Sequence, residues 1–112
     1  MKYKNELIKY FKSFSDKNID LLSEMFSDEI ELTDWNISAI GKDEVIEANR
    51  NIFNSVNNIQ ITPINFYLKS DFSYAAHISI VIDGIENLNV IDVIEFGDDG
   101  LILSIKDRKS VV

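Results

Sequence analysis

The chain has 112 residues, which is enough for one ordinary domain with its own hydrophobic core, and we expect a single domain over residues 1–112. It contains no cysteine, so disulfides, thiol nucleophiles and cysteine metal sites are excluded. The formal net charge of −8 argues against nucleic-acid binding, because phosphate recognition needs a concentrated basic surface. With 46% hydrophobic and 27% charged residues, the composition is typical of a soluble globular protein.

The first residues, "MKYKNELIKYF", mix charges with apolar side chains and lack the uninterrupted apolar segment of a signal peptide. No apolar run in the chain approaches the length needed to span a bilayer. We therefore expect a cytoplasmic protein with neither a membrane nor a nucleic acid as its partner.

Three helices and one strand are predicted in the first half of the chain. Apolar residues at helical spacing predict the first helix over Lys4–Ser15, and Asn18 suits the N-cap of a second, shorter helix that ends near "SDE". The alternation in Ile30–Asp34 predicts a strand, and the loop "NISAIG" leads to a third helix over Asp43–Val56. The expected buried positions of the third helix are Val45, Ile46, Ala48, Asn49, Ile52 and Phe53.

The second half is dominated by β-branched and aromatic residues and predicts an antiparallel meander of long strands. Pro63 indicates an edge strand or a bulge, because proline cannot donate a hydrogen bond to a neighbouring strand. Turns are predicted at "SD", "DG" and "GDDG", which separate strands over Ile59–Lys69, Phe72–Ile82, Glu86–Phe96 and Leu101–Lys109.

This order of elements predicts an α+β fold, in which three N-terminal helices pack on one face of a curved antiparallel sheet. The other face of the sheet also carries apolar residues, such as Ile91 and Val93. A sheet that is apolar on both faces needs a second partner for the uncovered face. We therefore expect a homodimer formed through the sheet.

Hairpin geometry predicts the face on which Asp92 lies. A three-residue loop with Gly84 in the left-handed conformation keeps Ala76 and Asp92 on one face, whereas a two-residue turn would mix amides into it. A four-residue loop over "GDDG" pairs Phe96 with Leu101 and leaves Asp92 among aliphatic side chains. Burial there would raise the pKa of Asp92, so that its neutral carboxyl group could donate a hydrogen bond.

Asp34 shares its parity with the apolar residues Ile30 and Leu32 and lies at the end of the first predicted strand. We expect it to stay ionised and to act as a base, which with a neutral Asp92 would form an acid/base arrangement. The alternative is that Asp34 only opens the turn "DWN", since aspartate favours such positions.

Four passages together resemble the nuclear-transport-factor-2-like superfamily, in its SnoaL-like and ketosteroid-isomerase branch. They are the aromatic first helix, "LSEMFSDEIELTD" before the first loop, "GKDEVIEAN" at the third helix, and the final "VIDVIEFGDDGLILSI" hairpin. The resemblance spans nearly the whole chain and implies a cystatin-like α+β roll whose helices and sheet enclose a conical pocket.

The resemblance also implies catalytic roles. In ketosteroid isomerases the general base is an aspartate at the end of the first strand, which matches Asp34. Their oxyanion hole combines a tyrosine of the first helix, matching Tyr10, with a protonated aspartate of a late strand, matching Asp92. One departure is that Trp35 stands where those isomerases have proline after the base.

These residues predict a small isomerase or cyclase that needs no cofactor and no metal, and that moves a proton next to the carbonyl of a small apolar substrate. Asp107 is the alternative proton carrier in a cyclase. A non-catalytic module that binds a small ligand or only dimerises is the other reading, in which Tyr10 is a core residue and Asp107 a solvated strand end. The expected pocket residues are Phe14, Phe26, Trp35, Phe53 and Asp107.

Overall fold

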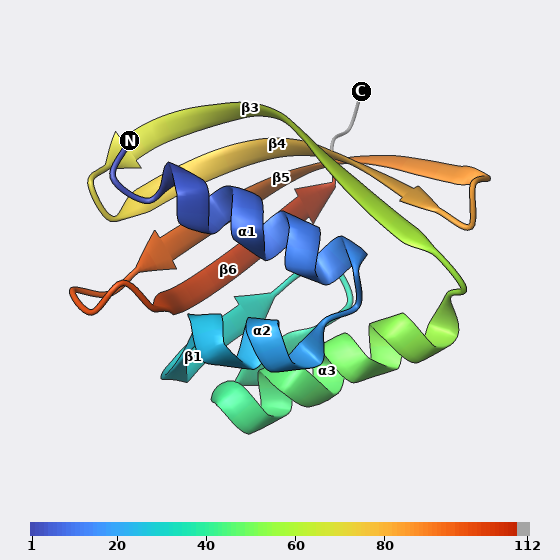
Figure 1. Cartoon of the computed structure of the whole chain (residues 1–112), viewed down its shortest axis with the longest axis horizontal. Coiled ribbons are helices and arrows are strands. Elements are labelled where there is room, and N and C mark those ends of the chain that lie inside the picture. The colour runs from blue at the N-terminus through green and yellow to red at the C-terminus, as the bar shows by residue number, and fades with distance from the viewer. Residues whose placement is uncertain (110–112) are drawn as a thin grey trace.

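The computed structural model describes residues 1–109, and Lys109 only by its backbone. It contains three helices and a six-stranded sheet (Figure 1). The helices are α1 (Lys4–Ser15), α2 (Ile19–Met25) and α3 (Lys42–Ser55). The strands are β1 (Phe26–Thr33), β2 (Ser38–Ile40), β3 (Ile59–Ser70), β4 (Ser73–Ile82), β5 (Glu86–Phe96) and β6 (Ile102–Lys109).

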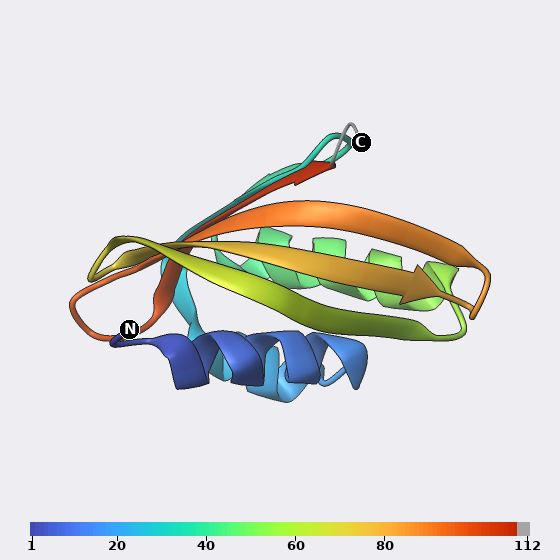
Figure 2. The same cartoon turned by 90° about the horizontal axis from the view of Figure 1, so that it is seen from above.

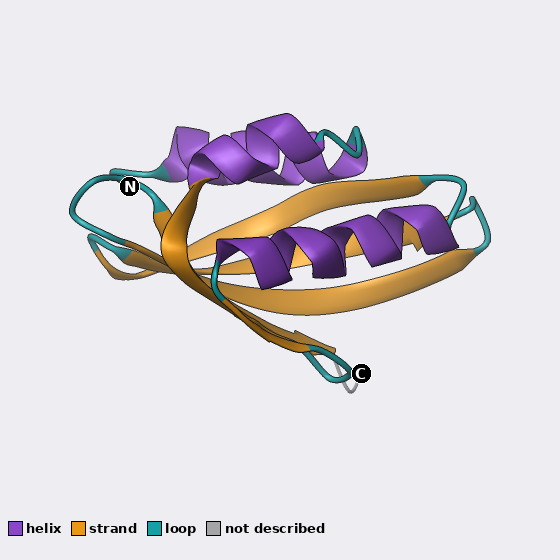
Figure 3. Ribbon diagram, turned by 90° about the horizontal axis from the view of Figure 1, so that it is seen from below, coloured by secondary structure: helices purple, strands orange, loops and turns teal. Residues whose placement is uncertain are grey.

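The predicted α+β class is confirmed, and the three helices lie together along one side of the curved sheet (Figure 3). Each helix lies close to its predicted bounds, and Asn18 caps α2 by accepting a hydrogen bond from the backbone N–H of Leu21 at 3.1 Å. Helix α1 packs on β3 at one edge of the sheet, whereas α3 packs on β1 and β2 at the other. The buried residues of the helices and of the inner sheet face therefore form one core.

The sheet differs from the prediction in two respects. Its strand order is β2-β1-β6-β5-β4-β3, and β1 pairs with β6 in parallel, so the sheet is mixed rather than wholly antiparallel. Part of the predicted loop "NISAIG" forms β2, which pairs with the end of β1. Three residues of this strand show too short an alternation to stand out in the sequence.

The predicted hairpin between β4 and β5 is confirmed. Ile82 pairs with Glu86 across a three-residue loop, and Gly84 in that loop has a φ of +70°, which a glycine adopts without strain. Pro63 lies on edge strand β3, next to a shift in the β3–β4 register. The pairing places Ala76 opposite Asp92 on the inner face, as predicted.

The predicted register of the last hairpin was wrong. Phe96 pairs with Ile102 rather than with Leu101, and a bulge follows, so that Glu95 pairs with Ser104. The bulged residue, Leu103, is exposed. Because the bulge adds a residue to β6, the side chain that faces Asp92 belongs to Asp107 and is not aliphatic.

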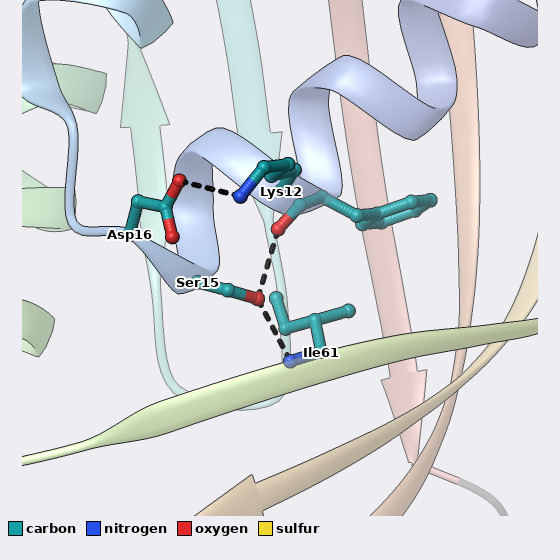
Figure 4. Close-up of polar contacts among 5 residues, drawn as sticks. Lys12, Ser15, Asp16 and Ile61 are labelled. Carbon is teal, nitrogen blue, oxygen red and sulfur yellow. Dashed lines mark hydrogen bonds and ion pairs between the residues drawn. The ribbon is translucent and has the colours of Figure 1, made fainter.

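A serine connects α1 to the free edge of the sheet (Figure 4). The Ser15 hydroxyl accepts a hydrogen bond from the backbone N–H of Ile61 at 2.9 Å and donates to the carbonyl of Phe11 at 3.0 Å. Since β3 is an edge strand, the Ile61 amide on this side has no strand to pair with. Ser15 therefore fixes α1 on the sheet.

No helix in residues 1–109 combines the length and the apolar character that crossing a membrane requires.

The Ser15→Ala substitution should lower the free energy of unfolding by about 1–2 kcal/mol, because it leaves the Ile61 amide without a partner in a partly buried place. Urea denaturation measures the change. The control is Ser55→Ala, since Ser55 only donates to the carbonyl of Ile52 at the exposed end of α3. Equal losses in the two variants would contradict this role of Ser15.

Candidate active site

Three aspartates lie in one row across neighbouring strands on the inner side of the sheet. Asp92 of β5 pairs directly with Asp107 of β6. Thr33 pairs with Lys106 in the parallel β1–β6 ladder, so the next position along both strands brings Asp34 beside Asp107. Neighbouring strands lie only about 4.8 Å apart, so three carboxyl groups in such a row interact strongly.

Asp92 and Asp107 behave as one carboxyl pair. Burial raises the pKa of Asp92 well above its ordinary value, a hydrogen bond to Asp107 raises it further, and the charges of Asp107 and Asp34 add to the effect. Burial also raises the pKa of Asp107, the hydrogen bond from Asp92 lowers it, and the charge of Asp34 raises it. A proton on Asp92 thus donates to the Asp107 carboxylate.

One oxygen of each member of this pair remains without a hydrogen bond. Asp92 Oδ1 and Asp107 Oδ1 are buried and find no partner among residues 1–109. Asp92 as a whole is only 4% exposed. Buried carboxyl oxygens are normally hydrogen-bonded, so two buried oxygens without a partner in one carboxyl pair are unusual.

Tyr10 of α1 faces this pair. Its ring packs against Phe11, Phe14 and Phe26, and the residue is 5% exposed. Burial raises the pKa of the Tyr10 hydroxyl well above its ordinary value, and the charges of Asp107 and Asp92 raise it further. The hydroxyl therefore keeps its proton, and among the described residues it has no hydrogen-bond partner.

Asp34 follows the last residue of β1 and shapes the connection to β2. Its Oδ1 accepts hydrogen bonds from the backbone N–H groups of Asn36 at 2.7 Å and Ile37 at 2.6 Å, and its own N–H donates to the Ile37 carbonyl at 2.9 Å. Asp34 is thus a turn residue, as one reading of the sequence predicted. The turn occupies only Oδ1, so the turn role leaves Oδ2 available to a ligand.

A cavity of about 370 Å³ opens at this end of the sheet, beside the connection from β1 to β2 (Figure 2 shows this connection next to the end of β6). Its size suits a small molecule. Three of the predicted site residues line it, namely Asp34, Trp35 and Asp107, and the other lining residues are Thr33, Lys106 and Arg108. Tyr10 and Asp92 do not line the cavity. Asp92 pairs with the lining residue Asp107, and Tyr10 lies beside that pair.

The indole of Trp35 forms part of the cavity wall and is held by its neighbour. The residue is 40% exposed, and with the Asn36 amide oriented to satisfy both partners, the indole N–H donates to Asn36 Oδ1 at 3.1 Å. Trp35 belongs to the same turn that Asp34 closes. The position of this aromatic wall therefore depends on the Asp34 carboxyl group.

The other three predicted pocket residues lie in the core and not on the wall of this cavity. Phe14 and Phe53 pack edge to face with ring centroids 4.7 Å apart, and Phe26 is fully buried beside Tyr10. These rings join α1, α3 and β1.

Sequence reasoning did not find Lys106 and Arg108, nor that Asp107 is the partner of Asp92. Both omissions follow from the bulge at Leu103, which shifts β6 against β5. The signal in the sequence was the three-residue spacing of Ile102 and Ile105, both fully buried, since regular strand alternation cannot put both on one face.

Within residues 1–109, no group of three or more histidine, aspartate or glutamate side chains is arranged to hold a metal ion. The three aspartates are spread along a row.

The free energy of unfolding of the Asp92→Asn variant, relative to that of the parent, should increase as pH rises. The raised pKa means that the folded protein binds more protons than the unfolded chain above about pH 4, so the free energy of unfolding of the parent falls as pH rises through the folded pKa. Asparagine removes this loss, which amounts to about 1.4 kcal/mol for each unit by which the pKa is raised.

Urea denaturation between pH 4 and 8 measures the difference between the variant and the parent at each pH. Asp98→Asn, in the exposed loop after β5, makes the same chemical change as a control. A difference between Asp92→Asn and the parent that does not vary with pH would contradict the shared proton.

Comparison with solved structures shows that the fold is shared with proteins of low sequence identity. A candidate ketosteroid isomerase from Kribbella flavida aligns with a TM-score of 0.84 at 16% identity, over 99% of this chain and 79% of that one. Nuclear transport factor 2 from Cryptosporidium parvum aligns with a TM-score of 0.81 at 14% identity, over 97% and 92%.

A third solved structure is SalBIII, an epoxide hydrolase/cyclase-like enzyme of pyran ring formation in salinomycin. It aligns with a TM-score of 0.77 at 17% identity, over 98% of this chain and 92% of its own. Identities this low show a common fold and no common activity. No curated protein matches the sequence.

The match to a family is more specific. Residues 5–84, which include α1, α2, α3 and the first four strands, match the model of the SnoaL-like domain. This match identifies the chain as a member of the SnoaL-like family, and its fold is the one found in nuclear transport factor 2.

Proposed function

We propose that this protein is a small isomerase or cyclase that moves a proton next to the carbonyl group of a small molecule bound at the end of β1 and β6. The observation that carries the proposal is the row of three aspartates, in which Asp34 and Asp107 line a cavity and the buried Asp92 pairs with Asp107 across the two strands. In the proposal Asp34 serves as the base, and the buried carboxyl pair beside it serves as the acid.

In the proposed reaction, the carboxylate of Asp34 takes a proton from the carbon next to the carbonyl. The C–H bond breaks, an O–H bond forms on Asp34, and the electron pair moves to the carbonyl oxygen, which becomes an enolate. For this the proton of the pair moves from Asp92 to Asp107, leaving Asp92 as the carboxylate, and the Asp107 O–H then donates a hydrogen bond to the enolate oxygen; the neutral Tyr10 hydroxyl lies beside the pair. In an isomerase, Asp34 then returns its proton to another carbon of the substrate.

In this proposal the predicted catalytic residues have roles that differ from those expected from the sequence. Of the pair, Asp107 is the member that lines the cavity, so it is the carboxyl group that a bound molecule would contact first. Asp92 would hold the proton behind it, and Tyr10 would keep the surroundings neutral and apolar. Trp35 would supply an aromatic wall for the carbon skeleton of the ligand.

The Asp34→Asn variant should lose about 10²–10⁴-fold in turnover, because an amide cannot accept the proton that a general base removes. The amide oxygen can still accept the backbone hydrogen bonds that hold the turn, so the melting temperature should change little. Isomerisation of a β,γ-unsaturated ketone, followed by absorbance of the conjugated product, measures turnover.

Asp34→Ala is the paired control, since it removes both the base and the turn acceptor and should lower activity and stability together. An Asp34→Asn variant that isomerises the ketone as fast as the parent would overturn the catalytic role of Asp34.

A non-catalytic module is the second candidate, and the packing of the core favours it. Phe14, Phe53 and Phe26 are buried in the core, and none of the three lines the cavity. In that case the cavity would bind a ligand without converting it, and the main function of the protein would be to form a dimer through its sheet.

Dimerisation through the sheet is part of either candidate. The face of the sheet turned away from the helices carries Tyr67, Ala75, His77, Ile91 and Val93 on neighbouring strands. Tyr67 is exposed, the others are half-buried, and His77 lies 3.3 Å from the amide oxygen of Asn89 on the same face. Such a mixed apolar and hydrogen-bonding face is suited to a second copy of the sheet.

Ile91→Lys should weaken the dimer at least tenfold, because the ammonium group would be buried without a partner between two sheets. Sedimentation equilibrium measures the dissociation constant. Ile85→Lys is the control, since Ile85 is exposed in the β4–β5 turn. A parent protein that stays monomeric at millimolar concentration would exclude this assembly.

A further inference from the structure

We infer that the free edge of β3, together with the neighbouring side of α1, is a docking site for an extended acidic peptide of another protein, which joins the sheet as an additional strand. This edge lies across the sheet from the cavity at the end of β1 and β6. The docking site is independent of the proposed reaction.

The first observation is that one half of this edge is covered and the other half is open. At the start of β3, the Ser15 hydroxyl takes the Ile61 N–H, and Pro63 has no N–H to offer (Figure 4). A bulge after Pro63 shifts the β3–β4 register. From the bulge onward the edge carries Ile64 and Leu68, which are 49% and 57% exposed. Exposed apolar residues on an unpaired strand form a template on which another chain can pair.

The second observation is the direction of the backbone groups beyond the bulge. In an antiparallel ladder, successive residues turn their N–H and C=O groups alternately toward the neighbouring strand and away from it. The Ile61 N–H turns away from β4, and the residue opposite Ile61 has the same parity on β4 as the residues opposite Phe66 and Leu68. The backbone groups of Phe66 and Leu68 therefore face the free edge as well, and within residues 1–109 no side chain bonds to them. An added strand would pair with these groups.

The third observation is a groove beside this edge. Helix α1 lies along β3 on the side away from β4 (Figure 2). A groove of about 410 Å³ runs between them, and its apolar lining includes Ile8, Phe11, Ile61 and Pro63. Ile8 is 45% exposed, so apolar side chains on one side of an added strand would bury it. Helix α1 thus supplies a floor for that strand.

The charges around the groove indicate the chemistry of the partner. Lys4, Ile8 and Lys12 follow one another at four-residue spacing, so on one side of α1 two exposed cations flank the exposed isoleucine. Lys69 is exposed near the end of β3. Residues 1–15 contain four lysines and a single glutamate, in a chain whose net charge is −8. This basic strip on an acidic protein complements an acidic peptide.

A second copy of the chain fits the edge less well. Two β3 edges that paired with each other would bring the lysines of two α1 helices together, and like charges repel. Asp16 also lines the groove and pairs with Lys12 at 3.1 Å, but it lies at the end that Ser15 already closes. The open half therefore favours an acidic partner.

The first test uses two labelled peptides, EVEIEVE and KVKIKVK, which share the alternation of a strand and differ in the sign of their charge. Fluorescence anisotropy with the full chain at low ionic strength should show EVEIEVE binding about fivefold more tightly or better, and added salt should reduce the difference. The double variant Lys4→Glu/Lys12→Glu should prefer KVKIKVK. Its matched control, Lys9→Glu/Arg50→Glu, reverses two exposed charges away from the groove and should keep the preference of the parent.

A second test at Leu68 examines the strand pairing itself. Leu68→Pro removes the N–H on the free edge and leaves the β3–β4 ladder intact, whereas Leu68→Ala shortens the side chain and keeps the N–H. EVEIEVE should bind Leu68→Pro about fivefold more weakly than Leu68→Ala, because one hydrogen bond is lost. Equal binding to these two variants, equal binding of the two peptides to the parent, no binding of EVEIEVE, or the same loss in both charge-reversal variants would overturn the inference.

Discussion

The burial of aspartates held side by side on one face of a sheet, reinforced by the repulsion between their charges, is the constraint on which the rest of this account depends. Asp92 and Asp107 face each other across β5 and β6, and Asp34 follows at the end of β1. The backbone hydrogen bonds of the ladders fix the spacing, so the carboxyl groups cannot move apart. Burial is the main reason that the pKa of each member rises; the charge of Asp34 raises both further, and the hydrogen bond between the two raises the pKa of Asp92 and lowers that of Asp107.

The fold places this row where a ligand can reach one end of it. Helix α1 supplies a neutral tyrosine beside the pair, the core phenylalanines exclude water from its inner side, and the turn after β1 carries Trp35 to the cavity. Asp34 has two places in this arrangement, because one of its carboxyl oxygens closes the turn and the residue also lines the cavity. A residue with a plain structural role can therefore also be the proposed base.

Much of this could be predicted from the sequence because it depends on local patterns. The three helices follow from the spacing of apolar residues, and the β4–β5 register follows from the conformational freedom of Gly84. The pairing of Asp92 could not be predicted, because the apolar run Leu101–Leu103 hides which residue is bulged. Burial of Phe14 and Phe53 in the core instead of a pocket was equally inaccessible, since core and pocket walls use the same residue types.

The shared proton is the central claim, and ¹³C NMR of the aspartate carboxyl carbons tests it most directly. Specific assignment of Asp92 and Asp107 by their asparagine variants would give the titration of the pair against pH. Above the pH range in which exposed aspartates titrate, we expect one proton still bound to the pair, with Asp92 changing its carboxyl shift at a higher pH than they do. Two carboxyl groups that both complete their titration near pH 4, as exposed aspartates do, would contradict the arrangement.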